Sequence, residues 1–123
     1  MDAEQQLQKE ITLRPATDED RGFLLGVYAA GREIELAAVP WDDTMKGAFI
    51  EHQFTAQDMH YKSEYPGSTH EIIQFGSDPA GRIYLHRSAD EIAILDLAVL
   101  PQFRRKGIAT EFVQRLQDEA QEA

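Results

Sequence analysis

The chain of 123 residues contains no cysteine, and this absence removes three kinds of chemistry. Without a thiol there can be no disulfide, no thiolate metal site and no cysteine nucleophile. The histidines do not replace those ligands, because none of them has a paired spacing such as H-x-x-x-H. They are His52, His60, His70 and His86. We therefore expect no bound metal.

Long apolar runs are missing as well. No stretch approaches the ~18 apolar residues that cross a membrane. The N-terminal segment "MDAEQQLQKE" lacks the basic region and the apolar run of a signal peptide. The sequence therefore predicts a soluble, cytoplasmic protein that does not bind membranes.

Basic residues are scarce: the chain has 12 against 22 acidic residues, and its formal net charge is -10. Nucleic-acid binding needs a broad basic face, so we expect no nucleic-acid partner. An acidic surface suits cationic or amine partners, and it also serves solubility. The length, with 42% hydrophobic residues, fits one domain. We expect that domain over residues 10–123, after a flexible arm over residues 1–9.

The N-terminal half predicts one strand and two helices. Residues 11–15 alternate and stop at a proline, as a short strand does. Thr17 is followed by three acidic residues, which favours a helix that begins there and ends at Gly31. A linker through residues 39–41 leads to a second helix over 43–65, which a Pro-Gly pair terminates.

Two residues of this half are candidates for substrate binding. Gln57 falls within the apolar stripe of the second helix, where its amide needs a partner or a cavity. A hydrogen bond to nearby backbone is the simpler explanation, and contact with a substrate is the other. Trp41 presents the same choice between core packing and the wall of a substrate pocket.

Three strands are expected in the second half. The segments "THEIIQF" (69–75) and "RIYLHR" (82–87) flank the turn "GSDPAG" and predict a hairpin. Residues 91–100, "EIAILDLAVL", are apolar on both faces, which indicates a central strand. Strict alternation places Leu95, Leu97 and Val99 on one face and Ile92, Ile94, Ala98 and Leu100 on the other. Asp96 interrupts this strand, and a carboxylate there is costly unless it is paired or used.

The segment "VLPQFRRKGIAT" places three cations at the start of the last predicted helix. A helix start carries unpaired N–H groups and partial positive charge, so these cations repel it. No Ser, Thr, Asp or Asn stands over residues 101–109 to cap it. Gly107 and Ala109 are small enough for a close approach of the backbone to an anion. The segment therefore predicts a cradle for an anion such as pyrophosphate; an ordinary solvated basic turn is the alternative.

The segment "LDLAVLPQFRRKGIAT" resembles the acetyl-CoA-binding motif of the GNAT superfamily of N-acetyltransferases, V-x-P-x-x-R/Q-x-x-G-x-G/A. The matching positions are Val99, Pro101, Arg104, Gly107 and Ala109, with Ala where Gly is more frequent. The element order also resembles that family over residues 10 to about 121. The resemblance implies an α/β (α+β) fold: a mixed, mostly antiparallel sheet of about four strands with helices on both faces.

In that family the acyl donor is acetyl-CoA, and the resemblance implies which residues would bind it. The backbone of Leu97, Ala98 and Val99 would pair with the pantetheine arm. The pyrophosphate would lie on Arg104, Arg105, Lys106, Gly107, Ile108, Ala109 and Thr110.

The implied reaction is the transfer of an acetyl group to a primary amine of a small molecule or a protein. A neutral amine attacks the thioester, and a base or water removes its proton. Asp96 is the first candidate for that base, and a structural hydrogen bond is its alternative role. Tyr84 is a second catalytic candidate and His86 a weaker one.

The chain also departs from the resembled family, because the usual C-terminal strand, helix and hairpin are lacking. We therefore expect a C-terminally truncated domain whose strand over 91–100 leaves an uncovered edge. A second copy in a homo-oligomer, or a missing C-terminal segment, would cover it. An alternative function is then a noncatalytic acyl-CoA-binding or assembly module.

Overall fold

The computed structural model describes residues 10–122, and its centre is a four-stranded sheet. The strands are β1 (Ile11–Pro15), β2 (Thr69–Phe75), β3 (Asp78–Arg87) and β4 (Ile92–Val99). They lie in the order β1-β2-β3-β4, and each neighbouring pair is antiparallel. The predicted α/β fold with about four strands is confirmed. The predicted arm over residues 1–9 lies outside the described residues.

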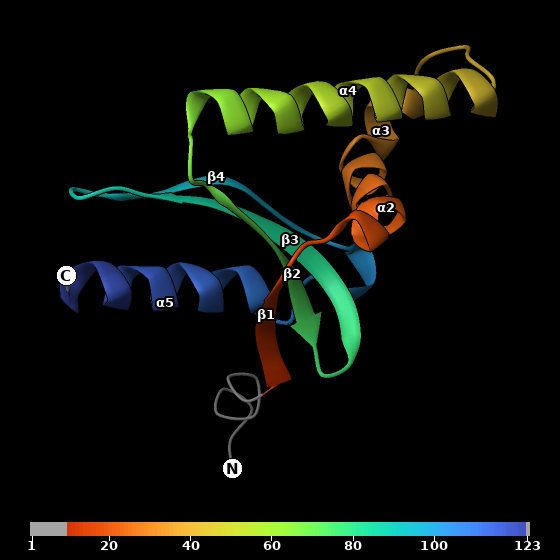
Figure 1. Cartoon of the computed structure of the whole chain (residues 1–123). Helices are drawn as coiled ribbons and strands as arrows, with labels where there is room; N and C mark the ends of the chain where they lie inside the picture. The colour runs from red at the N-terminus through yellow and green to blue at the C-terminus, as the bar shows by residue number, and fades with distance from the viewer. Residues whose placement is uncertain (1–9, 123) are drawn as a thin grey trace.

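Helices cover both faces of the sheet (Figure 1). One face carries α2 (Arg21–Gly31), α3 (Glu33–Ala37) and α4 (Asp43–Glu64), and the other carries α5 (Ile108–Glu122). Two short 3-10 turns, η1 (Asp18–Asp20) and η2 (Pro101–Phe103), precede α2 and α5. None of the helices within residues 10–122 has the length and apolarity that a membrane span requires.

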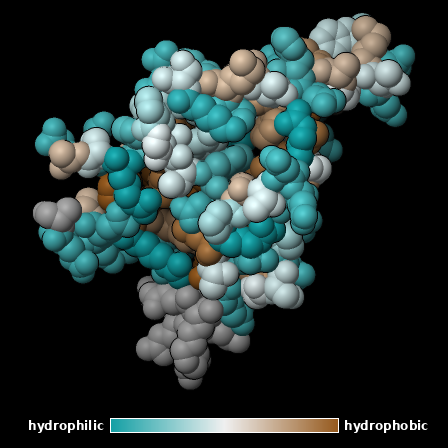
Figure 2. Space-filling view, viewed as in Figure 1, coloured by the Kyte–Doolittle hydropathy of each residue, from teal (hydrophilic) through white to brown (hydrophobic). Residues whose placement is uncertain are grey.

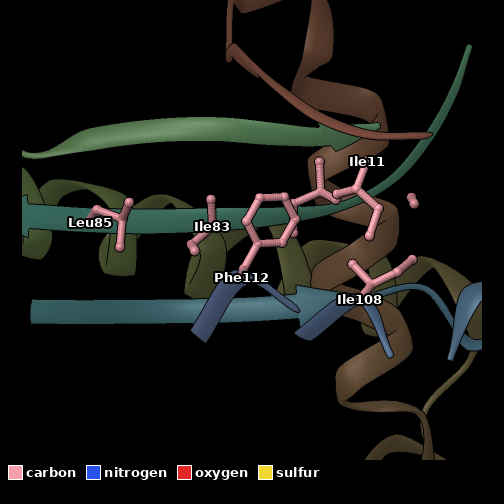
Figure 3. Close-up of a cluster of buried hydrophobic side chains, with 7 residues drawn as sticks. Ile11, Ile83, Leu85, Ile108 and Phe112 are labelled. Atoms are coloured by element: carbon pink, nitrogen blue, oxygen red, sulfur yellow. The ribbon is translucent and has the colours of Figure 1, made fainter. Parts of the chain in front are cut away.

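Each helical layer buries its own apolar cluster against the sheet. Figure 3 shows Ile108 and Phe112 of α5 facing Ile11, Ile83 and Leu85. The spacing of four residues places both α5 side chains on one face of the helix, as the sequence predicted. The opposite cluster contains Leu24, Tyr28, Ile50, Phe54 and Ile72. In the view of Figure 2, the surface over these layers is mainly hydrophilic, which agrees with the high content of charged residues.

The two predicted helix starts near the N-terminus are present, and carboxylates hold both. The Asp20 carboxylate accepts the Thr17 backbone N–H at 2.8 Å and both terminal nitrogens of Arg14 at 2.8 and 2.9 Å. The hydrogen bonds from Arg14, then that from Thr17, hold the pKa of Asp20 well below its usual range. At α4 the Asp42 side chain accepts the backbone N–H of Met45 at 2.8 Å.

Two connections differ from the prediction. The sequence analysis assigns no helix between Gly31 and the linker through residues 39–41, but residues 33–37 form α3, since they are good helix formers and Leu36 packs on the core. The hairpin turn is shorter than "GSDPAG", because β3 already begins at Asp78. Gly76, with φ +64°, makes the turn, and the following proline is accommodated where the β2–β3 register shifts.

The apolar faces of residues 91–100 indicate a central strand, and this expectation is wrong. Within residues 10–122, β4 is an edge strand, which agrees with the expectation that it leaves an uncovered edge. Its register shifts opposite Tyr84 and Leu85, because Tyr84 pairs with Asp96 while Leu85 pairs with Ile94. The bulge at Leu95 breaks the strict alternation, so Ile92 packs in the same cluster as Leu97 and Val99.

The open edge of β4 remains without a neighbouring strand among the described residues. Ile94 on this strand is 41% exposed, which is high for a large apolar side chain in a sheet. A homo-oligomeric partner or a further segment that covers this edge stays a prediction.

Replacing Gly81 with alanine should destabilise the fold, because an added Cβ would collide with the carbonyl oxygen of Ala98 on β4. Strand backbone cannot move aside as a flexible side chain can, so we expect a loss of about 2 kcal/mol of unfolding free energy in urea titrations. The matched control is Gly47→Ala in α4, whose Cβ meets nothing within 4 Å. That variant should gain up to about 1 kcal/mol from helix propensity. Equal stability of the two variants would contradict the close approach of β3 and β4.

Candidate functional site

The start of α5 borders a cavity of about 320 Å³. Its lining consists of Val99, Phe103, Arg104, Arg105, Gly107, Ile108, Ala109 and Thr110. Seven of these residues belong to the set that the sequence analysis assigned to a coenzyme. The structure therefore brings the predicted cradle together around one hollow, and we call this hollow the loop cavity.

The loop that enters α5 has an unusual backbone. Arg105 has φ +66° and Gly107 has φ +79°, so two of three consecutive residues are left-handed. The Arg104 side chain donates from Nε to the Val99 carbonyl at 3.0 Å, which ties the loop to the end of β4. Lys106 does not line the cavity, and its Nζ lies 5.7 Å from the centroid of the Phe75 ring.

These features fit a diphosphate. α5 begins at Ile108, and its first turn leaves N–H groups that an anion can accept. The lining residues Arg104 and Arg105 add two positive charges to the helix dipole. A ligand of opposite charge in the loop cavity would offset the repulsion between these cations and the helix start.

A second cavity, of about 170 Å³, lies on the other face of the sheet between α2, α4 and β4. Three predicted residues line it: Gln57, Asp96 and Ala98. Arg32 and Arg82 line it as well. We call it the Asp96 cavity. Leu97, which lies between two of these strand residues, turns to the opposite face and packs in the α5 cluster.

A partly buried ion pair forms the wall of the Asp96 cavity. Arg82 is 2% exposed, and its Nη2 and Nε lie 2.5 and 2.7 Å from Oδ2 of Asp96. Arg82 Nη2 also donates to Oε1 of Gln57 at 2.5 Å. The Gln57 amide in an apolar helix stripe and the Asp96 carboxylate in an apolar strand are therefore both explained by Arg82, because its guanidinium binds each of them.

The two cavities border the edge strand β4 at neighbouring residues. Ala98 lines the Asp96 cavity and Val99, the next residue, lines the loop cavity. Successive residues of a strand point to opposite faces, so the two hollows lie on either side of β4. A ligand that follows the open edge of this strand can reach both.

Tyr84 belongs to a third cavity, of about 400 Å³, which it lines with His70, Asp58 and Lys62. Its hydroxyl donates to Asp58 at 3.3 Å, and its ring stacks on His70 with centroids 4.4 Å apart. Burial raises the pKa of Tyr84 and lowers that of His70 to about 4, to which the charge of Arg82 contributes. The structure thus places Tyr84 outside the Asp96 cavity, although Tyr84 and Asp96 pair across β3 and β4.

The remaining candidates lie apart from these cavities. Trp41 packs edge-on against Phe49 at 5.3 Å, at the start of α4, and lines none of the three cavities. His86 lies against the ring of Tyr65 at 5.3 Å. Over residues 10–122 no group of three or more His, Asp or Glu side chains is arranged to hold a metal ion.

The sequence analysis missed Arg82 and Arg32. A signal for Arg82 was present, because an aspartate in an apolar strand calls for a cation, and the preceding hairpin strand offers Arg82 two residues before Tyr84. Arg32 follows the glycine that ends α2 and carries no signal of its own. Only the packing of α2 against the sheet brings it to the cavity.

Comparisons with known proteins identify the family of the chain and the structures that share its fold. The model of the acetyltransferase (GNAT) family matches residues 32–123, which is most of the chain. No curated protein sequence matches the chain at a significant level.

Several solved structures share the fold. A PaiA N-acetyltransferase from Thermoplasma acidophilum, in complex with coenzyme A, aligns with a TM-score of 0.60 and 16% identity, over 91% of this chain and 72% of that protein. A GCN5-related N-acetyltransferase from Rhodopseudomonas palustris gives a TM-score of 0.54 and 21% identity, over 89% and 64% of the two chains. A putative GNAT family acetyltransferase from Staphylococcus aureus gives 0.50 and 18%, over 89% and 90%. The chain thus spans less than two thirds of the second of these proteins.

The buried imidazole of His70 predicts a dependence of stability on pH. Its pKa is about 4 in the fold and near 6.5 when unfolded, so the unfolded chain binds the extra proton between these values. Stability from this group is complete above pH 6.5 and falls as the pH drops towards 4. We expect a loss of about 2 kcal/mol across that window, because each pKa unit is worth about 1.4 kcal/mol and part of the ring is solvated.

Urea titrations at pH 7 and pH 4.5 would measure this loss. His70→Gln should reduce the difference between the two pH values, whereas the control His60→Gln, on an exposed position of α4, should leave it unchanged. If His70→Gln shows the full wild-type difference, the assigned pH dependence of this group is wrong.

Proposed function

Because the chain belongs to the GNAT family of acetyltransferases, we propose that it is an N-acetyltransferase that transfers an acetyl group from acetyl-CoA to a primary amine. The main support is the position of the two cavities. They flank one open strand edge, with Arg104 and Arg105 lining one and Asp96, paired with Arg82, lining the other. The coenzyme A complex of the Thermoplasma protein, which has the same fold, is consistent with the proposal.

On the donor side, the loop cavity would hold the pyrophosphate of acetyl-CoA. Ile108, Ala109 and Thr110 offer the first N–H groups of α5, and Arg104 and Arg105 neutralise the negative charge. The open edge formed by residues 97–99 would accept the pantetheine arm as if it were a further strand. Bound acetyl-CoA supplies the activated acetyl group as a thioester.

On the acceptor side, the amine would enter the Asp96 cavity. The amine nitrogen forms a bond to the carbonyl carbon as the carbon–sulfur bond breaks, and the nitrogen loses a proton. Asp96 is the proposed acceptor of that proton, directly or through a water, and Arg82 orients its carboxylate through Oδ2. A backbone N–H near Val99 would stabilise the developing oxyanion. The proposed reaction does not use Tyr84, since its hydroxyl faces Asp58.

A noncatalytic acyl-CoA-binding or assembly module is the second candidate. The open edge of β4 favours it, because a binding module can use such an edge for a partner strand. Both functions use the same site for the acyl-CoA, but only the enzyme transfers the acetyl group to an amine.

Acetyl-CoA should raise the melting temperature of the protein. At about 100 times the dissociation constant, a ligand adds ~2.7 kcal/mol of stability. Ala109→Glu should abolish most of this shift, since the exposed Ala109 lines the loop cavity and a carboxylate there repels a diphosphate. The substitution is compatible with the fold, because an acidic residue in the first turn of a helix is favourable.

The control is Gln117→Glu, which adds the same charge at an exposed position further along α5. It should keep the full shift. A protein whose melting temperature does not respond to acetyl-CoA, or an Ala109→Glu variant that responds like the control, would exclude the loop cavity as the coenzyme site.

Asp96→Asn should lower kcat for acetyl transfer by about 100-fold, because general base catalysis contributes at least this factor. The shift with acetyl-CoA should be retained. Release of CoA on addition of a panel of primary amines is the measurement. Since Asn also weakens the buried Arg82 pair, the assay is run well below the melting temperature of the variant.

The pH profile separates a base from a purely structural residue. Without its base, the variant should recover rate relative to the wild type as the pH rises, because hydroxide in solution can then take the proton that Asp96 accepts. A uniform loss at every pH would assign Asp96 a structural role alone. CoA binding without release by any amine would favour the noncatalytic module.

A further inference from the structure

The charges that line the Asp96 cavity are unexpected for a site that binds a cationic amine. Two guanidinium groups, from Arg32 and Arg82, accompany a single carboxylate, from Asp96. The lining therefore carries an excess of positive charge, although the whole chain has a formal net charge of -10. A simple diamine or polyamine would bring a second cation against this excess.

One of the two cations is already neutralised. Arg82 is 2% exposed and is held by Asp96 and Gln57, so its charge is compensated within the wall of the cavity. The charge that remains for a ligand is that of Arg32, whose side chain is 37% exposed.

Arg32 is held in place from one side only. Its Nη2 donates to the Tyr28 hydroxyl at 3.3 Å, and its guanidinium carbon lies 5.1 Å from the centroid of the same ring. Tyr28 in turn donates to Gln53 of α4 at 3.1 Å. The nearest acid is Glu35 at 3.5 Å, which does not line the cavity and is 69% exposed, so this ion pair is weak. A guanidinium that is oriented but weakly paired is suited to binding a carboxylate.

We propose that the acceptor is an α-amino acid, whose carboxylate binds Arg32 while its amine lies near Asp96 and Ala98. This inference rests on the proposed function and names the substrate class of its acceptor site. The size agrees, since a cavity of about 170 Å³ has room for the glycine-like head of such a molecule and leaves a side chain to extend outward. The carboxylate of the amino acid matches the charge of Arg32, and its amine can approach Oδ1 of Asp96, since both contacts from Arg82 go to Oδ2.

Binding is tested first, because it does not require turnover. Calorimetric titrations in the presence of saturating CoA compare matched amines with and without the carboxylate: tyrosine with tyramine, histidine with histamine, and ornithine with putrescine. The carboxylate-bearing member of at least one pair should bind about tenfold more tightly or better, the typical value of a charge-assisted hydrogen bond. CoA release with acetyl-CoA then measures the same preference as a ratio of kcat/KM.

The matched variants are Arg32→Gln and Arg21→Gln. Both arginines belong to the α2 region and lie over an aromatic ring, since Arg21 is 5.5 Å from the Phe54 centroid, and each is near one exposed glutamate. Arg21 does not line the Asp96 cavity. Arg32→Gln should remove the preference for the carboxylate through Kd and KM with little change in kcat, and Arg21→Gln should retain it. Glu35→Gln should strengthen binding of the amino acid several-fold, because it removes the competing acid.

Three outcomes would overturn the inference. They are equal or tighter binding of the amines without a carboxylate, a preference that survives Arg32→Gln, and no binding of any amino acid of the panel. Failure of the proposed function is recognised separately, since the melting temperature would then not respond to acetyl-CoA. Transfer to amines without a carboxylate would retain the proposed function and refute the amino acid acceptor.

Discussion

A guanidinium buried in the middle of a sheet must be neutralised, and this constraint on Arg82 organises the site. Its partners come from two different elements, Asp96 on β4 and Gln57 on α4. A charge that loses its hydration is stable only with a close counterion and further hydrogen bonds, so β3, β4 and α4 have to meet at one place. The Arg82 guanidinium also lies 5.5 Å from the centroid of the Phe54 ring, so a second residue of α4 packs against it. The position of α4 over the sheet and the shape of the Asp96 cavity follow from it.

The edge strand β4 connects this packing to the candidate active site. The bulge at Leu95 interrupts the regular ladder of β4, and the Tyr61 hydroxyl of α4 donates to the Leu95 carbonyl at 3.0 Å. Beyond the bulge, Asp96 and Ala98 face α2 and α4, whereas Leu97 and Val99 face α5. One short strand therefore presents a carboxylate to one hollow and the entrance to a cationic loop to the other. A reaction between two ligands that bind on opposite faces requires such an edge.

Several features were predictable because they depend on local chemistry. The acidic residues after Thr17, the side chain of Asp42 and the spacing of Ile108 and Phe112 encode helix starts and a buried helix face within a few residues. Other features depended on distant residues. The helix over 33–37 forms because Leu36 packs on the core. The residues that share a face of β4 differ from those of strict alternation, because the pairing with β3 contains a bulge. Strict alternation gives no sign of an extra residue.

The sequence by itself determined the four strands and the three long helices, the gathering of cations and small residues before α5, and the need for a partner at Asp96. Each of these follows from local periodicity, from charges close along the chain or from the cost of burying a carboxylate. Only the tertiary structure decided which cation meets Asp96, that Tyr84 lies in a different cavity, and that Arg32 reaches the Asp96 cavity from the end of α2. The physical reason is that Arg82 lies 14 positions from Asp96 and Arg32 lies 64 positions from it, and only the packing of strands and helices brings all three to one cavity.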